Sequence, residues 1–456
     1  MRLTWAQPED LVAHELVQSA DEGSDVATIA ERWQEAGGSL VPEVSGASDR
    51  PADPDLRAYG RELLAELDAL AAAGRAAGTP AEPDELDAIE RTWPVPPPVV
   101  APGPDLPDRV HGGWLGRAAG CLLGKPVEKL PREAIREIAV ATGNWPLRTW
   151  FTEVGLPTDV AARWPWNRRS RPTSLAENID GMPEDDDLNF TILALRLLEE
   201  HGRGVGTEDV AAAWLADLPA GRVFTAERAA YRNLLAAYPP PLTATVGNPF
   251  REWIGALIRA DAYGWACPGD PAAAARLAWR DARLSHTRNG LYGAMFAAAM
   301  TAAACAAGPG PDGVEAVLAA GLSVLPPSSR LAAAVRRGAE LGRSTPDTEE
   351  ALDLLHAEFG HHHWVHVLNN AALIAYALRA GRGELGPSIA IAVTGGWDTD
   401  SDGATVGAVC GTLAGAAALP PEWTVPLRNR VATSIPGPDL LALDDLAART
   451  VRVAAR

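Results

Sequence analysis

Two segments of the chain carry glycine at every fourth position. The residues are Gly112, Gly116, Gly120 and Gly124 in GGWLGRAAGCLLGKPVE, and Gly403, Gly407, Gly411 and Gly415 in DGATVGAVCGTLAGAAA. Residues four apart share one face of an α-helix, so each set forms a smooth stripe. An interior helical glycine costs about 1 kcal/mol relative to alanine, a cost that is tolerated where another backbone approaches closely. The stripes therefore predict two tightly packed core helices.

The rest of the chain also indicates helices. Beyond residue 108, Ala- and Leu-rich segments are separated by Gly/Pro turns, with few alternating β-branched runs. Residues 8–36 and 56–75 have apolar residues at helical spacing, whereas TWPVPPPVVAPGPDLP is too rich in proline for a helix. We therefore predict an all-α protein with an acidic helical region at 1–91, a Pro-rich extended linker at 92–107 and a main domain at 108–456.

The N-terminal region has two possible arrangements, a helical cap docked on the main domain or a separate partner-binding module. Trp5, Leu11 and Trp33 suggest partial burial, and a rigid linker would hold the region near the main domain. We favour the docked cap.

Charge and composition exclude several classes of function. The net charge is −19, and residues 1–100 hold 20 Asp/Glu against 7 Lys/Arg, which argues against nucleic-acid binding. No apolar run reaches membrane-spanning length, and MRLTWAQPED lacks the apolar core of a signal peptide. Four scattered cysteines indicate neither a zinc site nor a disulfide framework. We expect a cytoplasmic protein with no nucleic-acid or membrane partner; its oligomeric state is not indicated.

A first acidic cluster stands before an apolar segment in MPEDDDLNFTILALRLLEE. Its members are Glu184, Asp185, Asp186 and Asp187. One or two acids at a helix N-terminus can simply cap the helix and complement its dipole. Four in succession repel one another, and a cation is the natural neutraliser.

A second acidic cluster, GGWDTDSDG, precedes the second glycine stripe. Asp398, Asp400 and Asp402 alternate there with Thr399 and Ser401, without the spacing or terminal Glu of an EF-hand. Carboxylates and hydroxyls with no paired His or Cys favour a hard cation, magnesium or manganese before zinc.

Four motifs in order resemble the ADP-ribosylglycohydrolase (DraG-like) family. They are GWLGRAAGCLLGKPVE, EDDDLNFTILAL, LSHTRNGLYGAMFAAAM and GGWDTDSDGATVGAVCGTLAGA, between about residues 108 and 425. The resemblance implies a compact orthogonal multi-helix bundle with two Mg²⁺ ions at the base of a ribose-binding cleft. It makes the main domain an ADP-ribosylglycohydrolase-like catalytic domain.

The resemblance also implies roles for individual residues. The family's Thr-Asp-Asp metal motif falls on Asp185, Asp186 and Asp187, although the register Glu184-Asp185-Asp186 stays open. Its Asp-x-Asp-Thr motif falls on Asp398, Asp400 and Ser401, and its early glutamate on Glu128. His286, Gly124 and Gly396 are placed at the substrate. An acid and a serine replace the two threonines, which keeps oxygen ligands but makes the site more negative.

These residues predict water attack at an anomeric carbon. Two metal ions could hold ribose hydroxyls and lower the pKa of a bound water, and an adjacent carboxylate would take its proton. Glu128 and Asp186 are both candidates for that base, and the residues do not rank them.

Two further features have alternative interpretations. His362 and His366 in HHHWVH have the spacing of HExxH ligands, but the Glu is absent, so we favour exposed or capping histidines over a zinc site. The Trp- and Pro-rich segment 143–174 is either a substrate-facing lid or a packed surface loop, and we favour the packed loop.

Three functions follow from these features. The first is a magnesium-dependent hydrolase that cleaves the glycosidic bond at the anomeric carbon of an ADP-ribosyl unit. That unit could be attached to a small molecule or to another ADP-ribosylated substrate. The second is the same chemistry on a small ribosyl or nucleoside-type metabolite. The third, a non-catalytic binding protein, is disfavoured by the full set of oxygen ligands.

Overall fold

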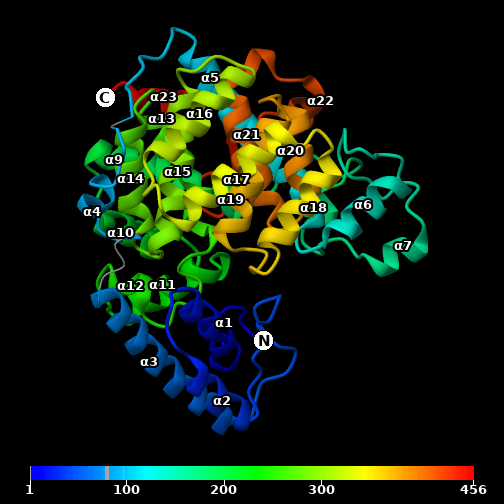
Figure 1. Cartoon of the computed structure of the whole chain (residues 1–456). Helices are drawn as coiled ribbons and strands as arrows, with labels where there is room; N and C mark the ends of the chain where they lie inside the picture. The colour runs from blue at the N-terminus through cyan, green and yellow to red at the C-terminus, as the bar shows by residue number, and fades with distance from the viewer. Residues whose placement is uncertain (1, 78–81, 96) are drawn as a thin grey trace.

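A computed structural model describes residues 2–77, 82–95 and 97–456, and helices form nearly all of its regular structure (Figure 1). The predicted all-α fold is confirmed. Strands β1 (Arg430–Ala432) and β2 (Leu440–Ala442) form a small antiparallel pair in which Val431 lies opposite Leu441. The N-terminal region contains α1 (Pro8–Asp21), α2 (Ala27–Glu35), α3 (Pro54–Ala77) and α4 (Leu86–Glu90).

The remaining helices follow in chain order. They are α5 (Leu106–Gly124), η1 (Lys125–Val127), α6 (Arg132–Ala141), α7 (Thr158–Arg163), α8 (Arg171–Ser174), α9 (Asp186–His201), η2 (Gly202–Gly204), α10 (Thr207–Asp217), η3 (Ala220–Arg222), α11 (Thr225–Leu235), α12 (Leu242–Thr245), η4 (Ile254–Arg259), α13 (Asp261–Ala266), α14 (Pro271–Ala282) and α15 (Arg288–Ala304). After these come α16 (Pro311–Ser323), α17 (Arg330–Ser344), α18 (Thr348–Phe359), α19 (Val367–Ala380), α20 (Leu385–Thr394), α21 (Thr399–Ala414), η5 (Ala416–Ala418), α22 (Pro421–Thr424), η6 (Val425–Leu427) and α23 (Leu443–Ala454).

The two glycine stripes face each other at the centre of the fold. Helices α5 and α21 run antiparallel, and a Cβ added to any stripe glycine except Gly415 would overlap backbone atoms of the other helix. The facing pairs are Gly112 with Gly411, Gly116 with Gly407, and Gly120 with Gly403. The predicted close approach of a second backbone is confirmed, because no side chain separates the two helices along the stripe.

This contact brings two distant parts of the sequence together. Gly124, at the end of α5, lies against Thr399 at the start of α21, and the Thr399 hydroxyl donates to the Gly124 carbonyl at 2.9 Å. The segments that carry Glu128 and the acids near Asp400 therefore meet at one end of the helix pair.

Arg117 joins this pair to two further helices. It is fully buried in α5, pairs with Asp261 of α13, and donates to the backbone carbonyl of Asp187 at 2.7 Å. The start of α9 is thereby fixed beside α5.

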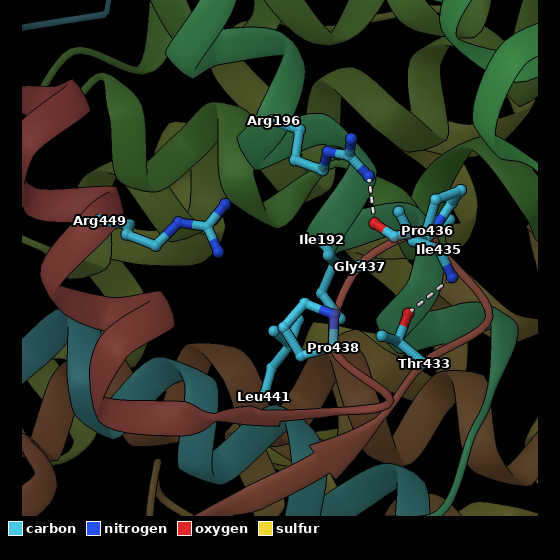
Figure 2. A pocket seen from close by; sticks show the side chains of 9 residues that line it. All are labelled: Ile192, Arg196, Thr433, Ile435, Pro436, Gly437, Pro438, Leu441 and Arg449. Carbon is cyan, nitrogen blue, oxygen red and sulfur yellow. Dashed lines mark hydrogen bonds between the residues drawn. The ribbon is translucent and has the colours of Figure 1, made fainter.

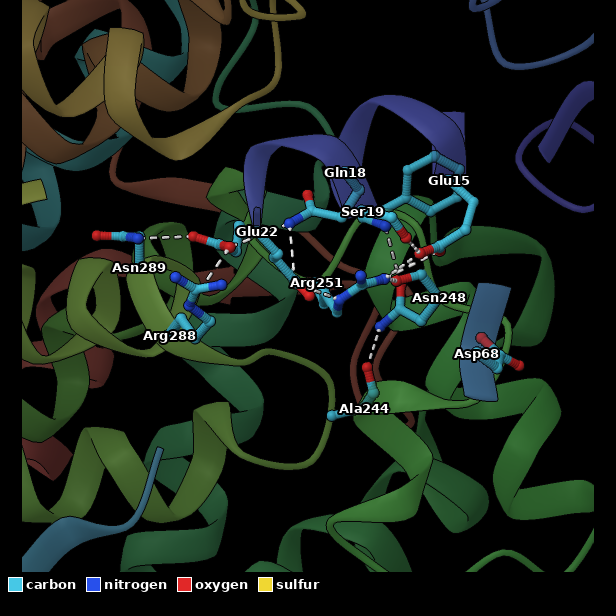
Figure 3. A network of polar contacts seen from close by, with 12 residues as sticks. Glu15, Gln18, Ser19, Glu22, Asp68, Ala244, Asn248, Arg251, Arg288 and Asn289 are labelled. Atoms are coloured by element: carbon cyan, nitrogen blue, oxygen red, sulfur yellow. Dashed lines mark hydrogen bonds and ion pairs between the residues drawn. The ribbon is translucent and has the colours of Figure 1, made fainter. Parts of the chain in front are cut away.

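The N-terminal region packs on the main body through buried charges. Figure 1 shows α1 to α3 gathered beside α11 and α12. In the network of Figure 3, Arg251 pairs with Glu15 at 2.9 Å and Glu22 at 2.7 Å, and Gln18 donates to Glu252 at 3.0 Å. These contacts agree with a docked cap, while the domain boundaries stay a prediction.

The predicted linker 92–107 contains no helix among its described residues 92–95 and 97–105, as its prolines predict, but its last two residues belong to α5, which begins at Leu106 because proline is tolerated in the first turn of a helix. The Val100 amide donates to the Gly269 carbonyl at 2.8 Å, and the Trp93 indole donates to the Val324 carbonyl at 2.8 Å. The linker therefore lies against the body. All four cysteines are free and buried. Within the described ranges, no helix is both long enough and apolar enough to span a bilayer.

We predict that Gly120→Ala destabilises the protein by about 2 kcal/mol or more, because the added methyl group overlaps the Gly403 carbonyl. Gly74→Ala is the matched control, since Gly74 lies inside α3 with no atom near its missing Cβ; this change should stabilise the protein by about 1 kcal/mol. Chemical denaturation measures both changes. Equal effects of the two substitutions would contradict the backbone contact.

We predict a pH-dependent contribution from Glu82. Burial raises its pKa, but hydrogen bonds and charge from Arg330 outweigh burial and lower it to about 2. Because the pKa of Glu82 is lower in the folded than in the unfolded state, its ionised carboxylate stabilises the folded protein fully at pH values above the unfolded-state pKa near 4.5. This contribution is lost as the pH falls towards 2. Glu82→Gln should therefore lower the free energy of unfolding by about 2 kcal/mol at pH 7. The difference from wild type should shrink below pH 4.5, whereas exposed Glu62→Gln should have little effect at any pH.

Candidate active site

The first acidic cluster forms the N-terminal turn of α9. Asp185 has extended backbone angles and caps the helix, because its Oδ1 accepts the Asp187 amide at 2.9 Å. The Asp187 side chain is 2% exposed, and its Oδ2 lies 3.4 Å from the Ser401 hydroxyl and 3.7 Å from the Cys121 sulfur. The capping interpretation thus holds for Asp185, whereas Asp187 is in an ion pair with Arg117 at 3.5 Å.

The second cluster forms the start of α21. Asp398 precedes the helix, and its amide donates to the Asn370 side chain at 3.2 Å. The Ser401 amide donates to Asp400 Oδ1 at 3.2 Å. Asp402 is fully buried, and neither of its carboxylate oxygens has a hydrogen-bond partner among the described residues.

Burial and, after it, mutual repulsion raise the pKa values of most carboxylates in the two clusters. Burial and the charges of neighbouring carboxylates raise the pKa well above the usual range for Asp186, Asp187, Asp398 and Asp402. Burial and the charge of Glu128 raise the pKa of Asp400 to about 7. A bound cation would relieve this repulsion, so the donor set fits a hard metal ion.

Lys125 already neutralises one of these acids. Its ammonium is buried, pairs with Asp185 and donates to the Glu184 carbonyl at 3.3 Å. Although burial raises the pKa of Asp185, the Lys125 charge holds it below the ordinary value. The acid at position 185, which made the predicted site more negative, is therefore matched by a cation.

Glu184 has partners outside the cluster. Its carboxylate accepts the Asn189 side-chain amide at 2.8 Å and pairs with Arg222 at 3.1 Å. These contacts favour the register in which Asp185, Asp186 and Asp187 form the metal motif.

Glu128 lies beside the two clusters, just after η1. Its side chain is 21% exposed, accepts the Asn167 side-chain amide at 2.7 Å and lies 3.4 Å from the Lys129 ammonium. Asn167 belongs to the Trp-rich segment 143–174. That segment packs Trp150 and Trp166 into the protein and lines the cleft with its last residues.

One cleft of about 1200 Å³ collects most of the predicted site residues. Its acidic floor consists of Glu128, Asp185, Asp186, Asp187, Asp398, Asp400 and Ser401. Its walls include positively charged and aromatic side chains, among them Lys129, Arg168, Arg169, Arg222, Phe224 and Trp364. The N-terminal region adds Thr4, Trp5 and Ser45.

Three predicted substrate residues do not line this cleft. Gly124 packs against the backbone at Thr399, and Gly396 forms a turn with a φ of +78° before the second cluster. His286 is buried, and its Nδ1 lies 2.8 Å from the Ser285 hydroxyl. Burial and the charge of Arg259 lower the pKa of His286 well below the usual range.

Sequence reasoning missed several cleft residues. Asn167, the partner of Glu128, lies in an irregular loop without a recognisable motif. One feature of the sequence could have identified two of these residues. Lys125 and Lys129 are the only lysines in the chain, and both line the cleft.

The histidine run does not form a second site. Asp21, His362 and His366 offer ligand atoms within 4.8 Å of one another. However, His366 caps α19 by accepting the Leu368 amide on Nδ1 at 3.2 Å, so the neutral ring carries its proton on Nε2. A metal ion at Nε2 would require loss of this cap. The predicted capping role is confirmed for His366.

A smaller cavity of about 200 Å³ lies between α9, α23 and the loop after β1 (Figure 2). Its two arginines are already paired, Arg449 with Glu199 at 2.7 Å and Arg196 with Asp217 at 3.1 Å. It therefore offers no free charge comparable to that of the large cleft.

A family comparison agrees with this site. The family model for ADP-ribosylglycohydrolase matches residues 102–455. Among solved structures, an "ADP-ribosylglycohydrolase-related protein complex" is similar at 22% identity and a TM-score of 0.46, over 77% of this chain and 98% of that one. No curated protein matches significantly. Because the family match spans most of the chain and all of the acidic floor, the protein belongs to the ADP-ribosylglycohydrolase family and is a hydrolase of glycosidic bonds.

Proposed function

We propose that the protein is a magnesium-dependent hydrolase that cleaves the bond at the anomeric carbon of an ADP-ribosyl unit. One observation carries this proposal. Carboxylates from segments more than 200 residues apart, including Asp186 and Asp398, line the floor of one cleft whose walls bear cations and aromatic rings.

The acidic floor suits magnesium, with manganese as a substitute. Asp185, Asp186, Asp187, Asp398, Asp400 and Ser401 would hold two ions through oxygen atoms. The raised pKa values favour this assignment, because a divalent ion would replace the protons that relieve the repulsion. Bound ions would supply Lewis acidity at ribose hydroxyls and lower the pKa of a coordinated water.

Glu128 is the better candidate for the general base. Its carboxylate is partly exposed to the cleft, and the Asn167 amide orients it. Asp186 is surrounded by other acids, which raise its pKa and suit it to binding a cation. Together the remaining carboxylates would stabilise positive charge developing on the sugar.

The walls favour an ADP-ribosyl substrate over a small ribosyl metabolite. The cleft of about 1200 Å³ exceeds the roughly 300–1000 Å³ usual for small-ligand pockets. Arg168 and Arg169 supply positive charge towards a diphosphate, and Trp364 and Phe224 offer rings to a nucleobase. A lone ribosyl group would leave these walls without a partner.

Hydrolysis of a substrate panel tests the proposal. The panel contains ADP-ribosyl-arginine, ADP-ribosyl-serine, 1″-linked ADP-ribose small molecules and nucleosides, each with Mg²⁺ or EDTA. We expect Mg²⁺-dependent release of ADP-ribose. Asp398→Asn and Glu128→Gln should each lower kcat at least about 100-fold. Asp159→Asn, an exposed change on α7, should have no effect. If no member releases ribose or ADP-ribose, the protein lacks the proposed activity.

We predict opposite effects of Lys125→Met on stability and metal affinity. Without metal, Asp185 loses its buried partner, which should cost about 3 kcal/mol. With metal, removal of a competing positive charge should tighten Mn²⁺ binding about 10-fold. Thermal unfolding in EDTA and Mn²⁺ titration measure the two effects. Lys129→Met, at a side chain that is 43% exposed, is the control. Unchanged Mn²⁺ affinity in Lys125→Met would contradict competition between the ammonium and the ion.

A further inference from the structure

Arg228 is a buried cation without a carboxylate partner. The residue is only 6% exposed, and it forms no ion pair within the described ranges. One guanidinium nitrogen, Nη1, donates to the carbonyl and hydroxyl oxygens of Thr4, whereas Nε has no hydrogen-bond partner among the described residues. A buried charge is normally paired, so this arrangement calls for an anion from outside the chain.

A second arginine approaches from another segment. Arg169 lines the large cleft, is exposed, and likewise has no acidic partner in the part of the chain that the structure describes. Burial first, and then the charge of Arg169, lower the pKa of Arg228 to about 10. Arg228 does not itself line the cleft, but Thr4, which accepts its hydrogen bonds, and Phe224 and Thr225, which precede it in the chain, do. Two guanidinium groups without acidic partners therefore repel each other beside this part of the cleft wall.

The local backbone adds to the positive potential. Arg228 lies in the first turn of α11, an eleven-residue helix whose N-cap, Phe224, provides no side-chain cap. The N-terminal residue Thr225 and Phe224 both line the cleft. Uncapped amide groups at a helix start favour a bound anion. The nearby acid Glu227 does not cancel this charge, because it pairs with Arg259.

Thr4 brings the N-terminal region into this arrangement. The segment around Thr4 is held by neighbouring Trp5, which packs edge-on against Phe250 and Trp253 with centroids 5.5 Å apart. Residues 2–95 lie outside the family match at 102–455. The contact with Arg228 therefore comes from a part of the chain that the family match does not include.

We infer that Arg228, Arg169 and the start of α11 form a phosphate-binding subsite of the cleft, which Thr4 of the N-terminal region completes by holding Arg228 in place. Its ligand is a phosphoryl group of the substrate, so the inference rests on the proposed function and adds the residues that recognise the nucleotide part. Arg228 and Arg169 bind the phosphate oxygens, and Thr4 positions Arg228 by accepting two of its hydrogen bonds.

Binding of ADP-ribose and of ribose by the full-length protein tests the subsite. Arg228→Met and, separately, Arg169→Gln should weaken ADP-ribose binding about 10- to 100-fold. Neither change should alter ribose or Mn²⁺ affinity, because neither residue belongs to the acidic floor. Arg169 is exposed, so Arg169→Gln keeps the test informative should Arg228→Met fold poorly. Arg171→Gln is the matched control, since Arg171 is close in sequence but already pairs with Glu153 at 2.6 Å.

The outcomes separate the inference from the function on which it rests. Selective loss of ADP-ribose affinity in both variants supports the subsite, even if the wild type hydrolyses none of the panel. Unchanged ADP-ribose affinity in both overturns it, even if the wild type is active. Equal losses for ribose and ADP-ribose would indicate general damage to the cleft and would also overturn it.

Discussion

The direct contact between the backbones of α5 and α21 determines where the acidic residues of the cleft floor lie. Helices with ordinary side chains pack with their axes about 8–10 Å apart, whereas facing glycines remove the side chains between them. Gly120 and Gly403 lie against each other, and at the end of the pair Gly124 meets Thr399. The loop with Glu128 and the start of α21 consequently reach the same cleft floor. A wider helix separation would move these two groups of ligands apart.

The acidic floor is unfavourable on its own and needs compensation from several directions. Each carboxylate is buried beside others, and an unpaired buried charge is costly. The protein offsets part of this repulsion internally, through Lys125 at Asp185 and Arg117 at Asp187. Among the described residues, Asp398 and Asp400 form no ion pair, although the charge of Lys125 also acts on Asp400. Asp185 and Asp187 are therefore held by cationic side chains of the protein. The difference agrees with the proposal that metal ions would neutralise Asp398 and Asp400.

The features of the fold and the site that could be predicted from the sequence are those that depend on residues close together in the chain. The glycine stripes indicated the central helix pair, and the acidic clusters at two helix starts indicated the floor of the cleft. The partners of these residues were not predictable in the same way. Asn167 reaches Glu128 from an irregular loop, and Thr4 reaches Arg228 from more than 200 residues away. Such contacts depend on how elements pack. The role of His286 was inferred from a motif, yet the fold buries this residue away from the cleft lining.

Docking of the N-terminal region and the shape of the cleft are physically linked. The Trp364 indole, in the cleft wall, donates to the Val44 carbonyl at 3.0 Å, and Ser45 next to it lines the cleft. The buried pairs of Arg251 with Glu15 and Glu22 hold α1 to the body, and the same N-terminal region carries Thr4 before α1 and Ser45 after α2. Weakening those distant ion pairs would therefore loosen one wall of the cleft without touching the acidic floor. In this protein, contacts made by the N-terminal region shape a wall of the cleft without involving its acidic floor.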